Sequence, residues 1–232
     1  VIYQTTPPVK EVSPKIKKGK SNPPSNYKIV FEDDFSTRFL DKTKWVPSQP
    51  WGEYNPSIPN EWWPQDETAL SLSNNTLNLE LRYFPKNFGS PVGFEIKHAA
   101  GLVRTEKQFK FGWFEADIKF PKGNNQFAHF GLQSYENPDT QINIFDAFTN
   151  PDQEEKFETY ACHWTEEFVH FYINGYLVKS ITDKETINSL NKSSQYLVLN
   201  NGLKDEPKDF KYYSVMEVKN VKIYQNERTP LS

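Results

Sequence analysis

Short runs in which apolar and polar residues alternate dominate this sequence of 232 residues from about position 27 onward. One run places leucines at every second position on both sides of an Asn74-Asn75 pair: Leu70, Leu72, Leu77, Leu79 and Leu81. A second run, 113–120, alternates apolar with charged residues and ends at a Pro-Lys-Gly turn signal. A period of two is typical of half-buried strands, so both runs predict antiparallel β-structure.

The segment 168–180 contains the clearest hairpin. Its first half alternates, Asn174-Gly175 has the composition of a type I′ turn, and the chain returns through 176–179. A last strand is predicted at 215–224 and one short helical turn at 185–190, while no segment keeps a helical period. Many short antiparallel strands predict an all-β fold, either a β-sandwich or a jelly roll.

Residues 1–26 have the composition of a linker, rich in proline and lysine and poor in apolar residues. We expect a flexible, semi-extended tail, either a plain spacer or a tether that lifts the domain off a surface, as behind a cleaved lipoprotein signal. Residues 27–232 are expected to form one domain. The first residues do not have the pattern of a signal peptide, so we expect the mature or trimmed form of a secreted or cell-surface protein.

Composition excludes several classes of partner. A hydrophobic fraction of 36% supports a packed core, and a net charge of -3 without a basic stripe argues against nucleic acid. No apolar run approaches the ~20 residues that a membrane span needs. The single cysteine, Cys162, excludes an internal disulfide.

Aromatic residues make up 16%, which predicts rings in the core and on a surface that stacks against a flat ligand. We expect a monomer.

Several segments, taken in order, carry a family resemblance. They are 31–35 (FEDDF), 40–45 (LDKTKW), 101–105 (GLVRT), 111–116 (FGWFEA) and 157–165 (FETYACHWT). Together they resemble glycoside hydrolase family 16, the endo-hydrolases of β-glucans and β-galactans. The resemblance covers roughly residues 30–225. It implies a concanavalin A-like jelly roll with a concave ligand cleft, and a polysaccharide chain as the partner.

In that family the catalytic residues follow the pattern Glu-x-Asp-x-x-Glu, and the aligned stretch here is 141–146, QINIFD. Gln141 and Asn143 project from the same face of a strand because side chains alternate. A one-residue bulge near Ile144-Phe145 would return Asp146 to that face. Ile142, with Ile144 or Phe145, would then point into the core.

The resemblance makes Gln141 the position of the nucleophile, Asn143 that of an aspartate that tunes its neighbours, and Asp146 that of the acid/base. A retaining glycosidase needs two carboxyl groups about 5–5.5 Å apart. An amide at 141 cannot attack the anomeric carbon. Asp146 is one methylene shorter than Glu, which withdraws the carboxyl by roughly 1.5 Å, and a misplacement of about 1 Å costs on the order of a hundredfold. These positions predict a cleft that binds sugar with impaired hydrolysis; the alternative is an ordinary polar strand face.

Trp51, Trp62 and Trp63 fall in a Pro- and Asn-rich segment, 50–64, that has the composition of a loop. Exposed rings on loops commonly stack on pyranose faces. Trp62 and Trp63 are adjacent and point opposite ways in an extended chain, so at most one of them is expected to face a ligand. The alternative is that some of these rings cap the core.

Two further residues are candidates for the cleft. Arg104 either donates to sugar hydroxyls, holds a cleft carboxylate or forms a surface ion pair. Glu158 replaces a histidine of the family pattern and is a candidate substitute carboxylate near Asp146.

No cofactor is expected to be required, since the four histidines have no spacing that makes a zinc site. The resemblance implies a possible structural calcium, because family members often carry one. Glu32 and Glu217 are the candidate ligands, with the hard oxygen donors that calcium prefers.

Three functional hypotheses remain open. The first is a polysaccharide-binding domain with hydrolysis lost or much reduced. The second is an active retaining endo-β-glycosidase that uses Asp146. The third is a structural or adhesion module without a sugar ligand.

Overall fold

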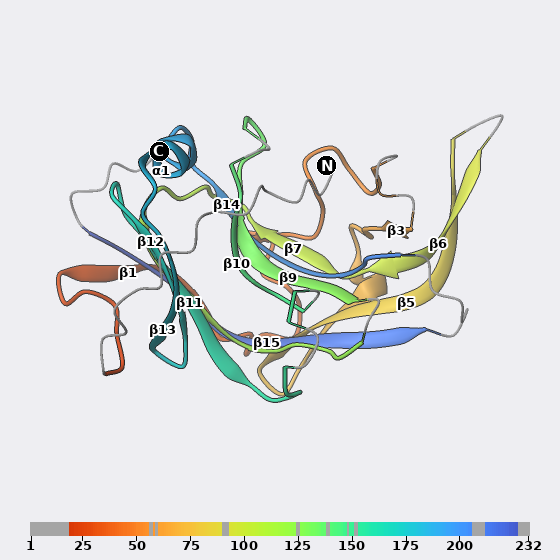
Figure 1. Cartoon of the computed structure of the whole chain (residues 1–232). Coiled ribbons are helices and arrows are strands. Elements are labelled where there is room, and N and C mark those ends of the chain that lie inside the picture. Colours follow the sequence, from red (N-terminus) through yellow and green to blue (C-terminus); the bar gives the residue numbers. More distant parts are fainter. Residues whose placement is uncertain are drawn as a thin grey trace.

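The computed structural model describes residues 19–55, 58, 60–89, 93–123, 126–137, 140–147, 149–150, 153–205 and 212–226. These residues form two β-sheets that lie as separate layers (Figure 1). The large sheet has the order β13-β12-β11-β8-β15-β5-β6-β3, with β1 paired to β15 and β4 paired to β5. The small sheet has the order β10-β9-β14-β7-β2. The all-β fold predicted from the alternating pattern is confirmed.

The bounds of the elements follow from the described residues. The large sheet contains β1 (Tyr27–Asp33), β3 (Glu61–Trp62), β4 (Leu70–Ser73), β5 (Thr76–Phe88), β6 (Phe94–Ala100), β8 (Gly112–Lys119), β11 (Glu158–Trp164), β12 (Val169–Ile173), β13 (Tyr176–Ile181) and β15 (Tyr213–Asn226). The small sheet contains β2 (Trp45–Val46), β7 (Leu102–Thr105), β9 (Gln126–Gln133), β10 (Ile142–Asp146) and β14 (Tyr196–Leu203). One 3₁₀ turn, η1 (Glu67–Ala69), and one helix, α1 (Lys184–Leu190), complete the described part of the chain.

Two hairpins form where the sequence predicts them. Asn74 and Asn75 connect β4 to β5 with φ of 52° and 55°. Asn174 and Gly175 connect β12 to β13 with φ of 51° and 81°. Positive φ at both central positions defines the type I′ turn, whose twist matches that of the flanking strands.

The core lies between the two sheets. The leucines that alternate along β5, Leu77, Leu79 and Leu81, are fully buried. The largest buried rings of the core cluster come from both sheets and from the segments that connect them: Phe35, Trp45, Phe114, Phe120, Phe130, Tyr160 and Trp164. Because these side chains face away from solvent on both layers, the small sheet presents only one face outward. We call this the outer face.

The N-terminal segment lies against the β12–β13 hairpin where it is described. The amide of Ser21 donates to the Gly175 carbonyl at 2.7 Å, and the Lys20 ammonium lies 5.9 Å from the centre of the Tyr176 ring. Strand β1 begins at Tyr27, the first residue of the predicted domain. Residues 1–18 lie outside the described residues, so the division into tail and domain stays a prediction.

The described part of the chain contains no helix with the length and apolar character that crossing a membrane requires.

Candidate functional site

The motif stretch 141–146 forms β10 and the residue that precedes it. The pairing of β10 with β9 shifts register between Asn143 and Phe145, which is the bulge that the sequence predicts. Ile142, Ile144 and Phe145 are buried in the core cluster. Asn143 is exposed, and its side-chain amide donates to the Asp146 carboxylate, so both side chains lie on the outer face.

The Asp146 carboxylate is already committed to contacts within the protein. Its Oδ1 accepts from the Thr149 amide at 2.6 Å and from the Thr149 hydroxyl at 2.9 Å, and its Oδ2 accepts from the Asn143 amide. The residue is only 2% exposed. Asp146 therefore anchors the turn that follows β10, and its lone pairs face internal donors rather than solvent.

The strand opposite β10 brings a histidine beside this carboxylate. His129 of β9 pairs with Asp146, and Gly131 pairs with Asn143. Directly opposite residues of antiparallel strands share a face, so His129 also lies on the outer face. Its imidazole covers Gly131, because a Cβ added there would lie 2.6 Å from His129 Cε1 and Nε2. Burial lowers the pKa of His129 to about 4, although Asp146 acts in the opposite direction.

No sequence motif pointed to His129 as a residue of the cleft. Its alternation with Phe127 and Gly131 along β9 was the available signal, because every second residue of a strand lies on one face.

A pocket of about 500 Å³ lies at the Gln141 end of the outer face. It brings together the predicted candidates Gln141 and Trp51. The indole of Trp51 is 41% exposed and meets the Tyr135 ring edge-on, with centroids 5.3 Å apart. The described residues that line the pocket are Pro50, Trp51, Asn55, Gln133, Ser134, Tyr135 and Gln141. An exposed indole beside side-chain amides is a surface suited to a sugar ring and its hydroxyls.

The expectation that Trp62 or Trp63 faces a ligand is wrong. Trp62 is 3% exposed and donates from Nε1 to the Phe84 carbonyl at 2.9 Å. Trp63 is 1% exposed and donates from Nε1 to Glu61 at 3.0 Å. The two indoles do point to different surroundings, but both are enclosed because the segment folds onto the two sheets. Trp62 joins a cluster with Phe88, and Trp63 joins a different one.

Arg104 serves as a support for the loop that precedes the tryptophans. Its Nε donates to the Ser48 carbonyl at 3.1 Å, and its guanidinium lies 4.8 Å from the centre of the Tyr196 ring. No carboxylate pairs with Arg104 in the described residues. The alternative of a cleft carboxylate or a surface ion pair therefore finds no support.

Glu158 does not lie beside Asp146. It accepts from the Tyr160 hydroxyl at 3.3 Å, and the Tyr160 ring packs against Phe145 with centroids 4.4 Å apart in the core. Phe145 and Asp146 are adjacent on β10 and point to opposite sides of the small sheet. Glu158 therefore approaches the core side of β10, and its predicted role as a substitute carboxylate is not supported.

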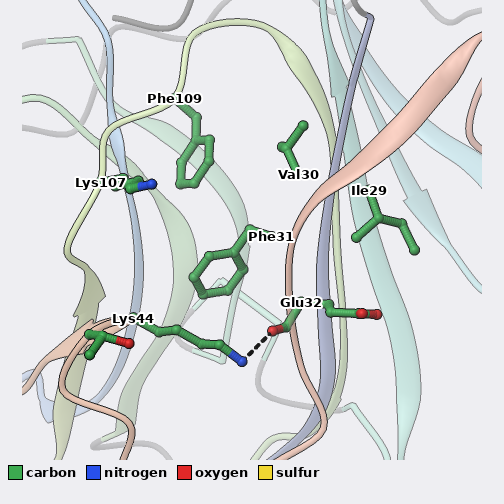
Figure 2. Close-up of a pocket in the computed structure, with 8 residues that line it drawn as sticks. Ile29, Val30, Phe31, Glu32, Lys44, Lys107 and Phe109 are labelled. Atoms are coloured by element: carbon green, nitrogen blue, oxygen red, sulfur yellow. Dashed lines mark hydrogen bonds between the residues drawn. The ribbon is translucent and has the colours of Figure 1, made fainter.

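The two candidate calcium ligands are not brought together. Glu32 lies opposite Lys222 of β15, which is five residues along that strand from Glu217. Glu217 instead forms an ion pair with Lys119 at 2.7 Å. Figure 2 shows the Lys44 ammonium on the backbone carbonyl of Glu32, at 2.9 Å, with the Glu32 carboxylate pointing away. Across the described ranges, no group of three or more His, Cys, Asp or Glu side chains could hold a metal ion. Calcium binding stays a prediction without support from this geometry.

The cavity drawn in Figure 2 is separate from the Gln141 pocket. It measures about 430 Å³, lies between β1 and the segment 107–109, and shares no lining residue with the pocket that contains Trp51. Its lining offers no carboxylate pair and no residue of the family motif. We therefore take the Gln141 pocket as the candidate functional site.

The other half of the outer face is covered. Leu102 of β7 and Val198 of β14 are 2% and 1% exposed and share a buried cluster with Ile58 and Trp63. Glu61 lies in the same cover: its Oε2 accepts from the Leu203 amide at 2.5 Å and its Oε1 from the Trp63 indole. Burial raises the pKa of Glu61 to about 7, although these hydrogen bonds and one from Asn200 lower it.

Solved structures resemble this protein, whereas known sequences do not. No family model matches the sequence, and none of the curated proteins is significantly similar to it. Among solved structures, SCLam, a non-specific endo-β-1,3(4)-glucanase from glycoside hydrolase family 16, superposes with a TM-score of 0.72. The two share 18% identity over 90% of this chain and 95% of that one.

Two other solved structures give the same result. The catalytic domain of a laminarinase from Thermotoga petrophila has a TM-score of 0.66 and 15% identity over 87% of this chain and 99% of that one. An endo-acting O-glycanase of the human gut microbiota, described for mucin breakdown, has a TM-score of 0.73 and 19% identity, over 91% of this chain and 95% of that one. The chain thus has the β-jelly-roll fold of family 16 glucanases, as its sequence motifs suggest.

Proposed function

We propose that this protein binds a polysaccharide, a β-glucan or β-galactan, on the outer face of its small sheet, and hydrolyses it weakly or not at all. The observation that carries the proposal is the pocket in which the exposed Trp51 indole lies beside Gln141. An indole face and side-chain amides provide apolar contact and hydrogen bonds for a sugar ring. The fold shared with β-glucanases supports a glycan as the ligand.

The chemistry of β10 supports the loss of hydrolysis. By its resemblance to family 16, Gln141 stands at the position of the nucleophile, and a neutral amide has no ionised oxygen with which to attack a sugar. The remaining carboxylate, Asp146, is 2% exposed and accepts hydrogen bonds from Thr149 and Asn143. A group that is enclosed by internal donors is a poor proton donor to a glycosidic oxygen in the groove.

Glycan-array or affinity-gel binding tests the first half of the proposal. We expect binding to β-linked glucans or galactans, and at least a tenfold weaker affinity for Trp51→Ala because the stacking surface is removed. Tyr176→Ala is a matched control, since Tyr176 is also an exposed ring but lies on the β12–β13 hairpin. Absence of binding to every glycan would leave a structural or adhesion role and contradict the proposal.

Reducing-sugar release from laminarin, lichenan, agarose and carrageenan tests the second half. We expect none above background from the unmodified protein. The triple variant Gln141→Glu, Asn143→Asp, Asp146→Glu restores the family pattern and is expected to gain hydrolysis if the groove geometry is intact. Single Gln141→Glu is the control, because it restores only one carboxylate. Hydrolysis by the unmodified protein at an ordinary enzymatic rate would contradict the proposal and favour a glycosidase that uses Asp146.

We also propose that the protein acts outside the cell or at its surface, where polysaccharide chains are met. The support is the kind of enzyme that shares the fold, which includes a glycanase for mucin breakdown and a laminarinase. Detection of the protein on intact cells or in the medium is the expected result, and confinement to the cytoplasm would contradict it.

A further inference from the structure

The outer face is covered at one side of its pocket, and we propose that the protein recognises the end of an uncharged glycan chain rather than its interior. This inference rests on the proposed function and specifies which part of the glycan is bound. It follows from three features: a cover over β7 and β14, an open side at β10, and a pocket whose described lining residues carry no charged side chain.

The cover lies directly on the strands that would otherwise continue the groove. In register, Asn143 of β10, Gly131 of β9, Val198 of β14 and Arg104 of β7 form one row across the small sheet. Asn143 is exposed, whereas Val198 is 1% exposed. A sugar chain that crosses the strands from β10 would therefore meet the covering segment before it reaches β7.

Glu61 shows how closely this segment approaches the sheet. A Cβ added at Gly202, on the outer face of β14, would lie 2.6 and 2.7 Å from the two Glu61 carboxylate oxygens. The Leu203 amide also donates to Glu61 at 2.5 Å. No sugar ring fits between β14 and a segment that is in van der Waals contact with its backbone.

Several independent contacts hold the cover in place. The Ser48 carbonyl accepts from Arg104 at 3.1 Å, and the Gln49 side chain accepts from the Tyr135 hydroxyl at 2.5 Å. Further along, Glu53 forms an ion pair with Lys86 at 2.7 Å. Because the anchors lie on β7, on the segment after β9 and on β5, opening the groove would require breaking all of them together.

Trp51 stands where the cover meets the open half. Its ring contacts Trp63 of the cover, with centroids 6.3 Å apart, and Tyr135 on the other side, with centroids 5.3 Å apart. The pocket that Trp51 and Gln141 line measures about 500 Å³, within the ~300–1,000 Å³ of small-ligand pockets. This volume suits a short terminal stretch of a chain, with Trp51 as the wall against which the last ring stacks.

The described lining of this pocket carries no charged side chain. Its polar groups for a ligand are the side-chain amides of Asn55, Gln133 and Gln141, since the hydroxyls of Ser134 and Tyr135 form hydrogen bonds within the protein. Side-chain amides both donate and accept, which matches sugar hydroxyl groups. A sulfate or carboxylate would lose its hydration here without gaining a cation from the described lining, and the Arg104 guanidinium, 6.0 Å from the centre of the Tyr135 ring, already donates to Ser48. We therefore assign the site to a neutral sugar end.

Stoichiometry by titration calorimetry distinguishes an end from an interior. The probes are laminari-oligosaccharides and neutral agaro-oligosaccharides of increasing length, with debranched laminarin and agarose of known chain length. Recognition of ends predicts one protein per chain at every length and an affinity that stops rising after about three sugar units. Several proteins per long chain, with an affinity that rises with length, would overturn the inference while leaving glycan binding intact.

A charged glycan gives the second test. Carrageenan oligosaccharides are expected to bind at least tenfold more weakly than neutral oligosaccharides of the same length. Equal or tighter binding of the sulfated series would overturn the assignment to a neutral sugar. If none of these probes binds and a glycan array is also negative, the proposed function itself is contradicted. This outcome differs from failure of the stoichiometry test and from failure of the charge test, in which glycan still binds.

Discussion

The two halves of the outer face of the small sheet have the same strand geometry and opposite surroundings. Over β7 and β14, Leu102 and Val198 are buried beneath Ile58 and Trp63. Over β9 and β10, Asn143 is exposed and Gln141 lines a pocket. The difference arises from a segment far away in sequence rather than from the strands themselves. A strand face becomes core or binding surface according to what covers it.

Each half also contains a carboxyl group that is almost fully buried, and the two are stabilised differently. Asp146 accepts from the amide and hydroxyl of Thr149, a residue three positions along the chain. Glu61 accepts from Leu203, which is distant in sequence, and burial raises its pKa to about 7. In the open half, a local turn thus holds the Asp146 carboxylate through hydrogen bonds from Thr149. In the covered half, the hydrogen bond from Leu203 to Glu61 holds the covering loop on the sheet.

The largest expected loss of stability comes from a substitution in the covered half. Trp63→Ala removes a 1% exposed indole from the cluster with Leu102 and Val198 and should lower the free energy of unfolding by about 3–5 kcal/mol. The matched change in the open half, Trp51→Ala, should cost less than about 1 kcal/mol because that ring is 41% exposed. Urea unfolding curves measure both. Equal costs would contradict the division of the face into core and site.

The next prediction concerns His129 in the open half. Burial lowers its pKa from 6.5 to about 4. Between these pH values His129 is therefore protonated in the unfolded chain and neutral in the folded chain. Stability should therefore fall as the pH falls from 6.5 to 4, by up to about 3 kcal/mol from this residue. His129→Gln should flatten the slope of the unfolding free energy in that window. An unchanged slope would show that the native state holds this imidazole protonated.

Glu61 in the covered half contributes with the opposite sign. Its pKa is raised from 4.5 to about 7, so the folded chain keeps a proton that the unfolded chain releases between these values. Its contribution is present below pH 4.5 and is lost as the pH rises toward 7. Glu61→Gln should make stability less sensitive to a rise in pH between 4.5 and 7, and the two single variants should change the pH profile in opposite directions. Burial also lowers the pKa of His163 to about 4. Both variants should therefore still lose some stability as the pH falls from 6.5 to 4, because His163 is unchanged in them.

Local patterns were sufficient to predict several strands and both hairpins. The alternation of Leu77, Leu79 and Leu81 and the Asn174-Gly175 turn depend on neighbours within a few residues, because the side-chain period of a strand is two. The bulge after Asn143, which returns Asp146 to the face of Asn143, was expected from the spacing of the family motif rather than from alternation.

Burial of the tryptophans could not be predicted in that way. A Pro- and Asn-rich loop normally lies on the surface, yet both indoles are enclosed. Trp63 packs over β7 and β14, whereas Trp62 packs against residues of β5 and β6. The position of Glu158 could not be predicted for a similar reason, since the side of the sheet that it approaches depends on the packing of Tyr160 against Phe145. Both outcomes are set by tertiary contacts between segments distant in the chain.

A pair of glycine substitutions sharpens the comparison at smaller cost. Gly131→Ala in the open half would place its Cβ 2.6 Å from the His129 ring, and Gly202→Ala in the covered half would place its Cβ 2.6 Å from Glu61. Each should cost about 1–3 kcal/mol through overcrowding. Only Gly131→Ala should also weaken glycan binding, because it displaces a side chain on the open half. Loss of binding in Gly202→Ala with a folded protein would mean that the cover takes part in recognition.

The smallest expected effect tests the role of Asp146. Thr149→Val removes the hydroxyl that donates to both carboxylate oxygens, at 2.9 and 3.0 Å, and keeps the backbone amide that donates at 2.6 Å. The loss should be about 1 kcal/mol in the free energy of unfolding, as for one hydrogen bond to a charged acceptor at a partly exposed position. Thr149→Ser retains the hydroxyl and should cost less, which separates the hydrogen bond from the loss of shape. If Asp146 served the ligand rather than the turn, Thr149→Val would instead leave stability unchanged and alter the affinity for glycan, because the carboxylate would have gained freedom to reach the groove.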